Sequence, residues 1–498
     1  GRGEGRAMRI DCDVVVVGGG PAGSHTAMAV ARFSRQNLRV VLIDRNDRSE
    51  FGKKTRRGWT CGDAVSRKSL EFVMENLGIR YERPEIEHEV DGVLVISPDH
   101  ETKVLFDGEG YLLNRKLWPQ KQLQYLEKLG VEVVFGVDVR TLLSEDNRIV
   151  GVKGTSKSGE PVEVRAKVVV DASGSASVLR ANLPIESYVE REIDKENDME
   201  ATGRYILEFD RVVEDETWFD PRYCIIHLDQ FLAPGGYCWT FPKGENKVNI
   251  GLGVQKTALD RRNAAHGLKD NLASLIDQYV RTNRAIVNPR EPEGYQDQGN
   301  TYSTWQVPVR RQNDCMVANG YVVVGDAAWM PRPIDAGGLG PSLYGSVILG
   351  RNIVRAVEED DVSQDGLWGY NVDYVRMYGY QMAGFEVFRR YLQTLPNDDI
   401  SFGMKYFLSE DDIESIKRRE HPRFPLLTNF LRVLLDAELR RRVRERPKLA
   451  RSLAYVADKS RRLIRHYLNY PERSSEFPRW RAQLLRELRE ANEKLGIT

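Results

Sequence analysis

Short apolar runs and a Gly-rich turn open the chain, and their order predicts a parallel α/β arrangement. Residues 11–17 read DCDVVVV, a strand-type run, and the Gly-rich turn follows at 18–23. Small and apolar residues over 22–35 are compatible with a helix, and residues 39–43 (RVVLI) predict a second strand that ends at Asp44. Strand, helix and strand within about 35 residues form a βαβ unit.

Three further stretches of pattern divide the rest of the chain. Strand-type runs recur at 131–135, 148–153 and 163–170. From 186 to 254 the sequence alternates and is rich in aromatic residues, as is typical of an antiparallel sheet. After about residue 363 the strand signals fade, and a charge-rich helical periodicity continues to the end.

Segments of nucleotide-binding type occur at 11–44, 163–180 and 321–345, with sheet-forming sequence between them. We therefore expect an α/β fold in which one Rossmann-like domain is assembled from separated segments, with an inserted antiparallel β-sheet substrate domain and a C-terminal helical region. The boundaries we predict are 8–183 and 301–362 for the nucleotide-binding domain, 184–300 for the sheet domain and 363–498 for the helical region.

Composition narrows the class of protein. The 498 residues include 73 Lys+Arg and 73 Asp+Glu, so the net charge is zero and gives no global electrostatic case for nucleic-acid binding. The five cysteines form no CxxC pair, which argues against a disulfide framework or a zinc knuckle and favours a reducing compartment. No apolar run reaches the roughly 18 residues of a membrane span, and no signal peptide is recognisable. We expect a soluble, cytoplasmic protein.

The zero net charge is a cancellation between two segments. Residues 431–465 hold 12 basic against four acidic residues, whereas 186–220 hold 13 acidic against four basic ones. Apolar residues run through the basic segment: Leu434, Leu435, Leu439, Val443, Leu449 and Leu453. One interpretation is a basic amphipathic surface that makes peripheral contact with anionic membrane lipids. The other is a solvated outer face of ordinary helices.

The Gly-rich turn has the spacing of a dinucleotide-binding fingerprint. Gly18 permits the tight turn, Gly20 lets a pyrophosphate approach the backbone, and Gly23 allows close packing of helix on strand. The helix N-terminus offers unpaired N–H groups to the phosphates. Asp44, at the end of the next strand, is placed to bind ribose hydroxyls.

A second motif distinguishes FAD from NAD. Residues 322–324 form a short apolar strand that ends in Gly325-Asp326, and residues 337–340 (GGLG) then open an apolar helix. A second helix N-terminus aimed at the same ligand suits the electron-rich pyrimidine edge of a reduced flavin, while Asp326 can accept from a ribityl hydroxyl. This half, together with Asp171-Ala-Ser-Gly174, resembles p-hydroxybenzoate-hydroxylase-type flavoproteins, and FAD is the cofactor we expect.

Two other stretches are similar to archaeal geranylgeranyl reductases, the digeranylgeranylglycerophospholipid reductase family. They are TCGDAVS at 60–66 and PGGYCWTFP at 234–242, the latter containing the YxWxFP segment of that family. Eight residues separate it from the GxG at 251–253, in keeping with the family spacing. One departure is Trp329, where family members often have a small residue; its indole could reshape the substrate tunnel or the rim of the flavin, so the family's chain-length preference is not carried over.

The fingerprint and the resemblance together define the cofactor-binding residues that we expect. They are Gly18, Gly20, Pro21, Ala22, Gly23, Asp44, Arg45, Cys61, Gly62, Ala64, Arg115, Val139, Gly325, Asp326, Gly337, Gly338, Leu339 and Gly340. No HxxxH motif or carboxylate pair has the spacing of metal ligands, so we expect no metal site.

The resemblance implies hydrogenation of the double bonds of geranylgeranyl chains in archaeal lipid precursors, by a hydride from reduced flavin N5 and a proton. The implied substrates are digeranylgeranylglycerophospholipids and geranylgeranyl diphosphate. Tyr237, Trp239 and Phe241 alternate, so in a strand they share a face that suits a polyprenyl chain; they could equally be sheet core. Together with Cys61 they are our catalytic candidates, and Cys61 could relay a proton, pack on the flavin or be merely structural.

Two other functions stay open at this point. A flavin monooxygenase or halogenase could use the same fold, since the aromatic segment is loosely similar to the WxWxIP of halogenases. A lipid-binding protein with a structural FAD is the third reading. The sequence does not identify the electron donor. Only one dinucleotide fingerprint is evident, so we expect no separate NAD(P)H domain, and a ferredoxin or a transient encounter with NAD(P)H stays open.

Overall fold

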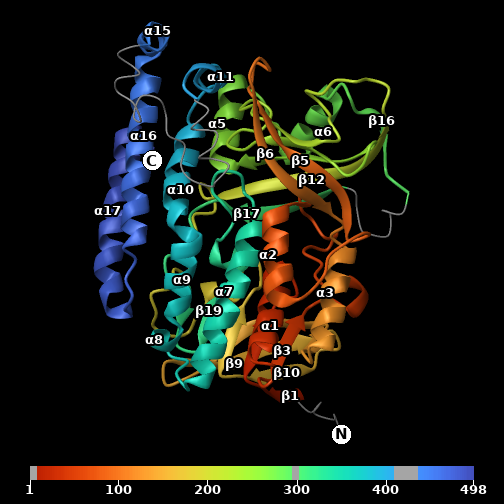
Figure 1. Cartoon of the computed structure of the whole chain (residues 1–498), viewed down its shortest axis with the longest axis vertical. Helices are drawn as coiled ribbons and strands as arrows, with labels where there is room; N and C mark the ends of the chain where they lie inside the picture. The colour runs from red at the N-terminus through yellow and green to blue at the C-terminus, as the bar shows by residue number, and fades with distance from the viewer. Residues whose placement is uncertain (1–7, 294–301, 409–435, 498) are drawn as a thin grey trace.

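The computed structural model of the chain describes residues 8–293, 302–408 and 436–497. A Rossmann-like layer forms one end of the molecule and a large sheet the other, and the C-terminal helices run along one side of both (Figure 1).

The Rossmann-like layer is built on a six-stranded sheet whose pairs are parallel except at one edge. Its strands, in spatial order, are β18 (Val317–Ala318), β19 (Tyr321–Val323), β11 (Val168–Asp171), β2 (Val14–Val17), β3 (Val40–Asp44) and β7 (Glu132–Phe135). Every residue of β2, β3 and β11 is buried, as expected for parallel strands covered on both faces.

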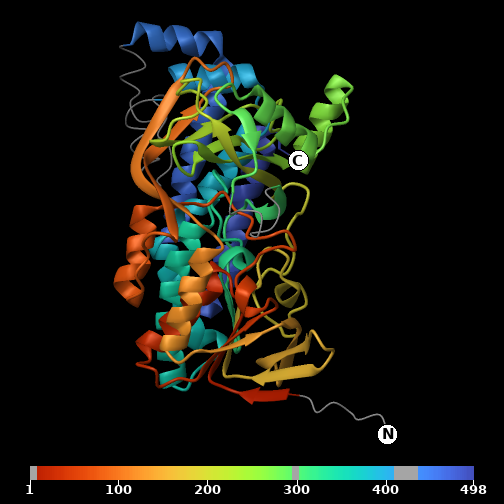
Figure 2. The same ribbon diagram turned by 90° about the vertical axis from the view of Figure 1, so that its right-hand side faces the viewer.

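Helices cover one face of this sheet and a smaller sheet lies on its other side (Figure 2). The helices are α1 (Pro21–Phe33), α3 (Leu117–Lys128) and α7 (Leu339–Glu358). The smaller sheet has the order β1 (Met8–Asp11), β10 (Pro161–Arg165), β9 (Arg148–Ser156) and β8 (Val137–Glu145). The Rossmann-like α/β fold predicted from the sequence is therefore confirmed.

Two predicted strands are each split where the chain passes from one sheet to the other. The run 11–17 becomes β1 and β2, and the run 163–170 becomes β10 and β11. β1 pairs with β10 and β2 with β11, so both breaks fall at the same step between sheets. The Lys167 N–H donates to the Asp13 carbonyl across that step. An apolar pattern alone does not reveal such a crossing.

The large sheet has nine strands. Their order is β16 (Val287–Arg290), β12 (Met199–Asp210), β15 (Lys247–Gln255), β14 (Cys238–Pro242), β13 (Tyr223–His227), β5 (Ile86–Ile96), β6 (Lys103–Leu113) and β4 (Ala64–Ser66), with β17 (Ser303–Pro308) also paired to β12. The pairs are antiparallel except β13 with β5. The segment 184–300 supplies β12 to β16, whereas β4, β5, β6 and β17 come from outside it. The large sheet therefore draws on more of the chain than this segment, and the domain boundaries given above stay predictions.

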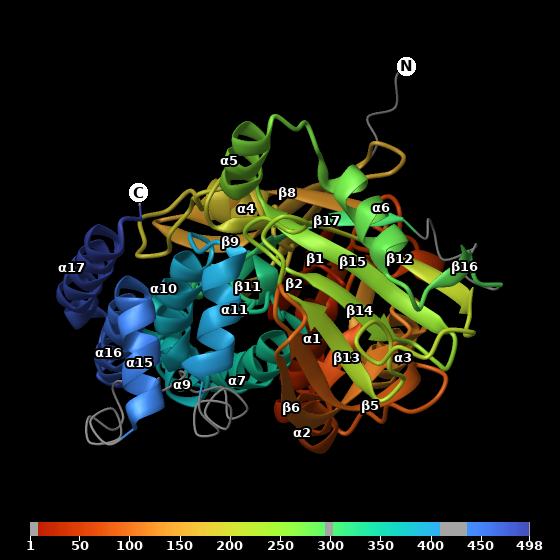
Figure 3. The same ribbon diagram turned by 90° about the horizontal axis from the view of Figure 1, so that it is seen from above.

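Helices pack beside and behind this sheet. α5 (Lys256–His266) and α6 (Leu272–Thr282) cover one face, where Leu275, Ile276 and Tyr279 of α6 are buried. Seen from above, the strands β12, β15, β14, β13 and β5 lie side by side, with the C-terminal helices next to them (Figure 3).

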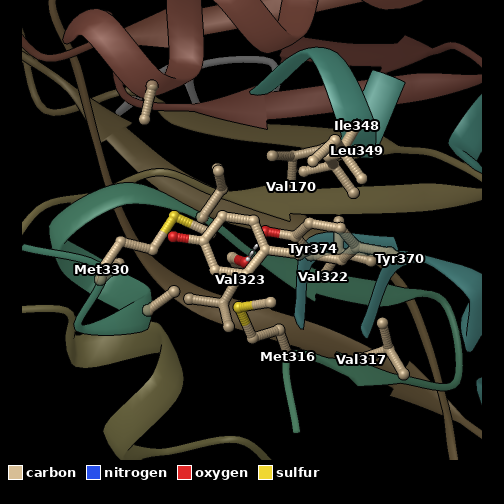
Figure 4. Close-up of a cluster of buried hydrophobic side chains, with 14 of the residues drawn as sticks. Val170, Met316, Val317, Val322, Val323, Met330, Ile348, Leu349, Tyr370 and Tyr374 are labelled. Atoms are coloured by element: carbon tan, nitrogen blue, oxygen red, sulfur yellow. Dashed lines mark hydrogen bonds between the residues drawn. The ribbon is translucent and has the colours of Figure 1, made fainter. Parts of the chain in front are cut away.

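The helical region expected after residue 363 is present in the described residues. It contains α8 (Gln364–Leu367), α9 (Gly369–Met377), α10 (Met382–Leu392), α11 (Asn397–Tyr406), α15 (Ala437–Glu445), α16 (Pro447–Leu468) and α17 (Phe477–Leu495). Figure 4 shows how it is joined to the Rossmann-like layer: Tyr370 and Tyr374 of α9 enter the apolar core formed by β11, β19 and α7. The Tyr370 hydroxyl donates to the Val323 carbonyl at 2.9 Å.

Helices α1 and α7 approach each other closely at Gly350. A Cβ added at Gly350 would lie 2.3 Å from the Cβ of Ala29, and 3.2 Å from the Ala29 backbone carbon. The glycine is therefore what lets α7 lie against α1.

We predict that Gly350→Ala lowers the free energy of unfolding by about 1–3 kcal/mol, because the added methyl group forces the two helices apart. Gly244→Ala is the control, since its Cβ would meet only the Lys247 Cβ at 3.9 Å. Denaturant titration of both variants measures the difference, and equal midpoints would show that the packing is less tight than described.

Candidate active site

A cavity of about 1820 Å³ extends between the Rossmann-like layer, the nine-stranded sheet and the C-terminal helices. Its lining includes the Gly-rich turn at one end, the aromatic side chains of β14 in the middle and apolar residues of α10, α11 and α16 further along. Most of the predicted cofactor and substrate residues thus line one continuous space.

The glycines of the fingerprint have separate structural roles. Gly18 has φ +110, and a Cβ there would lie 2.2 Å from the Ala172 carbonyl oxygen. A Cβ at Gly23 would lie 1.9 Å from the Gly18 carbonyl oxygen, so Gly23 allows α1 to pack on the turn. Gly20 lines the cavity, and a Cβ there would meet no atom within 4 Å. The open backbone at Gly20, just before the α1 N-terminus, leaves room for a pyrophosphate.

Asp44 lies at the end of β3 and lines the same end of the cavity. Its Oδ2 accepts the Gly52 N–H at 2.9 Å, and its Oδ1 accepts from the Asn46 side chain at 3.1 Å. Burial raises the pKa of this carboxyl group. These hydrogen bonds fix the carboxylate facing the space where a ribose would lie.

The residues at this end fit FAD. The N-terminus of α7 at Gly338 and Leu339 lines the cavity, as does Asp326, whose Oδ2 lies 3.5 Å from Lys54 Nζ. Arg115 is 8% exposed, and its Nε has no hydrogen-bond partner among the described residues. A buried arginine Nε without a hydrogen-bond partner, in a cavity that two helix N-termini also line, is what a phosphate- and flavin-bearing ligand would satisfy.

Most predicted cofactor residues line the cavity, and three do not. The lining set is Gly18, Gly20, Pro21, Ala22, Asp44, Arg45, Cys61, Gly62, Ala64, Arg115, Val139, Asp326, Gly337, Gly338 and Leu339. Gly23, Gly325 and Gly340 lie behind the wall, in close packing contacts. A Cβ at Gly325 would lie 2.6 Å from the Ala22 Cβ, and one at Gly340 would lie 3.1 Å from the Ser69 Oγ.

The three aromatic residues of the YxWxFP segment form a wall of the cavity, as their period-2 spacing predicts. The ring centroids of Tyr237 and Trp239 are 6.2 Å apart, and those of Trp239 and Phe241 are 6.1 Å apart. All three side chains line the cavity, and Trp305 from β17 lies 6.0 Å from Trp239. Trp305 was not anticipated, because β17 is distant in sequence and only the sheet brings it there.

Cys61 lies in a turn that directly precedes β4. Cys61 and Gly62 line the cavity, and a Cβ at Gly62 would be 3.3 Å from the Phe241 ring. Asp63 closes the turn with φ +68, and its N–H donates to Cys61 Sγ at 3.2 Å. The turn therefore brings Cys61 to the aromatic wall.

Buried polar side chains hold the turn, and sequence reasoning missed them. Lys243 Nζ donates to Asp63 Oδ2 at 2.6 Å, and both side chains are 1% exposed. Asn249 Nδ2 donates to Asp63 Oδ2 at 2.8 Å. The available signal was an Asn within the apolar run VNIGLG and a Lys directly after the aromatic segment.

The remainder of the cavity is lined largely by apolar side chains. α10 and its C-terminal end contribute Phe388, Leu392 and Leu395, while Ile400, Gly403, Met404, Leu449 and Leu453 come from α11 and α16. The sheet contributes Val90, Val93, Val95, Val104, Phe106 and Ile226. Such a surface favours a long hydrocarbon chain over a polar substrate.

Trp329 does not line the cavity, so the expectation that it reshapes the tunnel is wrong. Its side chain is fully buried, with the guanidinium carbons of Arg180 and Arg310 at 4.8 and 4.4 Å from the ring centroid. The residue takes φ +60, which turns the indole toward these two arginines. Its role is in packing.

The basic segment noted in the sequence is packed on its apolar side, while many charged side chains of both segments are exposed. Leu439, Leu449 and Leu453 are buried, so the apolar face of α15 and α16 is turned inward; Arg432, Leu434 and Leu435 lie outside the described residues. In the acidic segment, Glu190 lies 3.0 Å from Arg310. The exposed basic side chains of α15 and α16 are Arg441, Arg444, Lys448, Arg451, Arg462 and Arg465.

No described helix is both long and apolar enough to cross a membrane. No group of three or more His, Cys, Asp or Glu side chains in the described ranges could hold a metal ion.

The chain matches two protein families. Residues 11–220 match an FAD binding domain, and residues 198–288 match a geranylgeranyl reductase catalytic domain, which contains the aromatic wall and Asn249. Among solved structures, a geranylgeranyl bacteriochlorophyll reductase-like protein from Thermoplasma acidophilum shares the fold, with a TM-score of 0.68, 21% identity and coverage of 90% of this chain and 100% of that chain. A myxobacterial chondrochloren halogenase also shares the fold, with a TM-score of 0.61, 21% identity and coverage of 86% and 90%.

Curated relatives extend over nearly the whole chain. A digeranylgeranylglycerophospholipid reductase from Sulfolobus acidocaldarius is 31% identical over 97% of this chain and 99% of its own length. One from Methanothrix thermoacetophila is 29% identical over 80% of this chain and 92% of its own length. The cofactor is FAD, as the sequence predicts. The chain is an FAD-dependent oxidoreductase and belongs to the digeranylgeranylglycerophospholipid reductase family.

Proposed function

We propose that this enzyme reduces the isoprenoid double bonds of geranylgeranyl chains in digeranylgeranylglycerophospholipids, and of geranylgeranyl diphosphate as a smaller substrate. The observation that carries the proposal is one continuous cavity. The fingerprint lines it, and so do the apolar side chains of the large sheet, α10, α11 and α16, which together we call the apolar lobe. A prenyl chain in the apolar lobe would extend past the aromatic wall to the end where FAD fits. The names of the relatives support the same substrate class.

The chain's own residues can bind and orient the substrate. Each CH₂ group of the substrate that becomes buried contributes about 0.8 kcal/mol to the free energy of binding. The apolar lobe can therefore bind a prenyl chain without hydrogen bonds. Reduced FAD supplies the hydride. The faces of Tyr237, Trp239 and Phe241 can stabilise positive charge that develops at the more substituted alkene carbon. The same side chains exclude water from the reacting carbons.

Archaeal lipids from a host that makes unsaturated precursors provide the test of function. Expression of this protein should shift lipid masses upward in steps of two hydrogens, and the number of steps counts the double bonds reached. Substrate hydroxylation or halogenation, with no such mass shift, would instead indicate the monooxygenase or halogenase function. Unchanged lipids with a normal FAD content would indicate the lipid-binding function.

We assign Cys61 the relay of the proton to the second alkene carbon, since Cys61 lines the same cavity as the aromatic wall. Cys61→Ser should then slow reduction of the bound lipid by about tenfold or more, because a hydroxyl is a weaker acid than a thiol. Anaerobic single-turnover measurement gives the rate, and Cys12→Ser is the control, as Cys12 lies outside the cavity lining. An unchanged rate for Cys61→Ser would dismiss the relay and leave Cys61 as a packing residue.

We also propose that the exposed basic side chains of α15 and α16 make peripheral contact with anionic lipid head groups at the inner face of the membrane, where the substrate lies. Each such side chain near the surface contributes about 1 kcal/mol to the free energy of membrane binding.

We also propose that a ferredoxin or NAD(P)H supplies the electrons that reduce the FAD.

The membrane contact predicts binding to anionic vesicles. The protein should co-sediment with liposomes that contain anionic lipid at low salt, and Arg444→Glu combined with Arg451→Glu should weaken that binding. Both side chains are exposed. Neutral liposomes are the control, and failure of anionic liposomes to retain the wild-type protein would contradict the contact.

A further inference from the structure

Asn249 of β15 connects the aromatic wall to the turn that carries Cys61. Its side chain is fully buried, and its Oδ1 accepts the Trp239 Nε1–H at 2.9 Å. Its Nδ2 donates to the Cys61 carbonyl oxygen at 2.9 Å and to Asp63 Oδ2 at 2.8 Å. One amide therefore binds the indole of the aromatic wall and the backbone of the turn Cys61–Asp63, which we call the cysteine turn.

An amide at this position is costly unless its hydrogen bonds are made. Asn249 stands between Val248 and Ile250, both 0% exposed, in a strand whose buried side chains are mostly apolar. Burying an amide without partners costs about 1–3 kcal/mol by mutational measures. Here both donor and acceptor atoms of the amide are engaged, and an apolar side chain could make neither contact.

The cysteine turn has other supports besides Asn249. Lys243 Nζ donates to the Leu113 carbonyl at 2.9 Å as well as to Asp63. Gly62 packs against the Phe241 ring. Loss of Asn249 should thus leave the turn folded and change only how Cys61 and Trp239 lie relative to each other.

We propose that Asn249 is a positioning residue for the reduction: it sets how Cys61 lies relative to Trp239, and both line the cavity that would hold the alkene. The inference rests on the proposed function for its catalytic part. Asn249 does not line the cavity, so it acts through the two side chains that do.

The matched control is Asn283, in the same half of the molecule. It is 3% exposed, its Nδ2 donates to the Trp218 carbonyl at 3.1 Å, and its Oδ1 accepts the Ala285 N–H at 3.0 Å. Asn283 does not line the cavity and contacts neither Cys61 nor Trp239 among its hydrogen bonds. Replacing either Asn by Leu removes a comparable set of buried hydrogen bonds.

Single-turnover reduction of a geranylgeranyl phospholipid by the anaerobically reduced holoenzyme gives the catalytic readout. Asn249→Leu should lower this rate by about tenfold or more while FAD affinity stays within about twofold, because the interaction is needed to align the reacting groups. Asn283→Leu should lose similar stability but keep its rate within about twofold.

Alkylation of the FAD-free protein gives a second readout. Cys61 and Cys12 are both partly exposed, so the rate at Cys61 relative to Cys12 reports the cysteine turn. The ratio should rise in Asn249→Leu and in the smaller change Asn249→Ser, which serves if the Leu variant does not fold, and should stay at the wild-type value in Asn283→Leu.

The outcomes separate the two proposals. If wild-type enzyme fails to reduce the lipid, the proposed function fails, and the alkylation ratio still tests the positioning role. If wild type reduces the lipid but the Asn249 and Asn283 variants match in rate and in alkylation ratio, Asn249 is only structural and the inference is overturned.

Discussion

A buried ion pair between Lys243 and Asp63 joins the nine-stranded sheet to the turn that carries Cys61. The two side chains are 1% exposed and 2.6 Å apart, so neither charge can be solvated if the other is lost. Removing one partner of such a pair typically costs about 3–5 kcal/mol. Lys243 directly follows β14, which carries the aromatic wall, and Asp63 directly precedes β4. The pair therefore joins the strand of the aromatic wall to the turn that carries Cys61.

The cavity has a polar end and an apolar end because different layers supply them. Glycines, Asp44 and two helix N-termini come from the Rossmann-like layer, where the carboxyl ends of parallel strands meet. Aliphatic side chains come from the inner face of the large sheet and from α10, α11 and α16. A flavin and a hydrocarbon chain have the same division of polarity. We propose that the two meet at the aromatic wall, near Cys61.

The sequence was sufficient where the signal is local. The unit β2–α1–β3 follows from an apolar run, a glycine spacing and Asp44, and the shared face of Tyr237, Trp239 and Phe241 follows from period-2 spacing. The pairing of strands distant in sequence could not be predicted. Parallel pairing of β13 with β5 brings residues 86–113 into the large sheet, and no periodicity in the sequence indicates this pairing. Trp329 was misjudged because the sequence does not show which side chains lie against its indole ring.

The most direct test of the account is anaerobic reoxidation of the FAD in the reduced holoenzyme by a geranylgeranyl phospholipid. The account predicts that flavin absorbance returns at 450 nm to about the extent that double bonds disappear from the lipid, and that the fully saturated phospholipid leaves the flavin reduced. Persistence of the reduced flavin in the presence of the unsaturated lipid, with oxygen alone able to reoxidise it, would contradict the account.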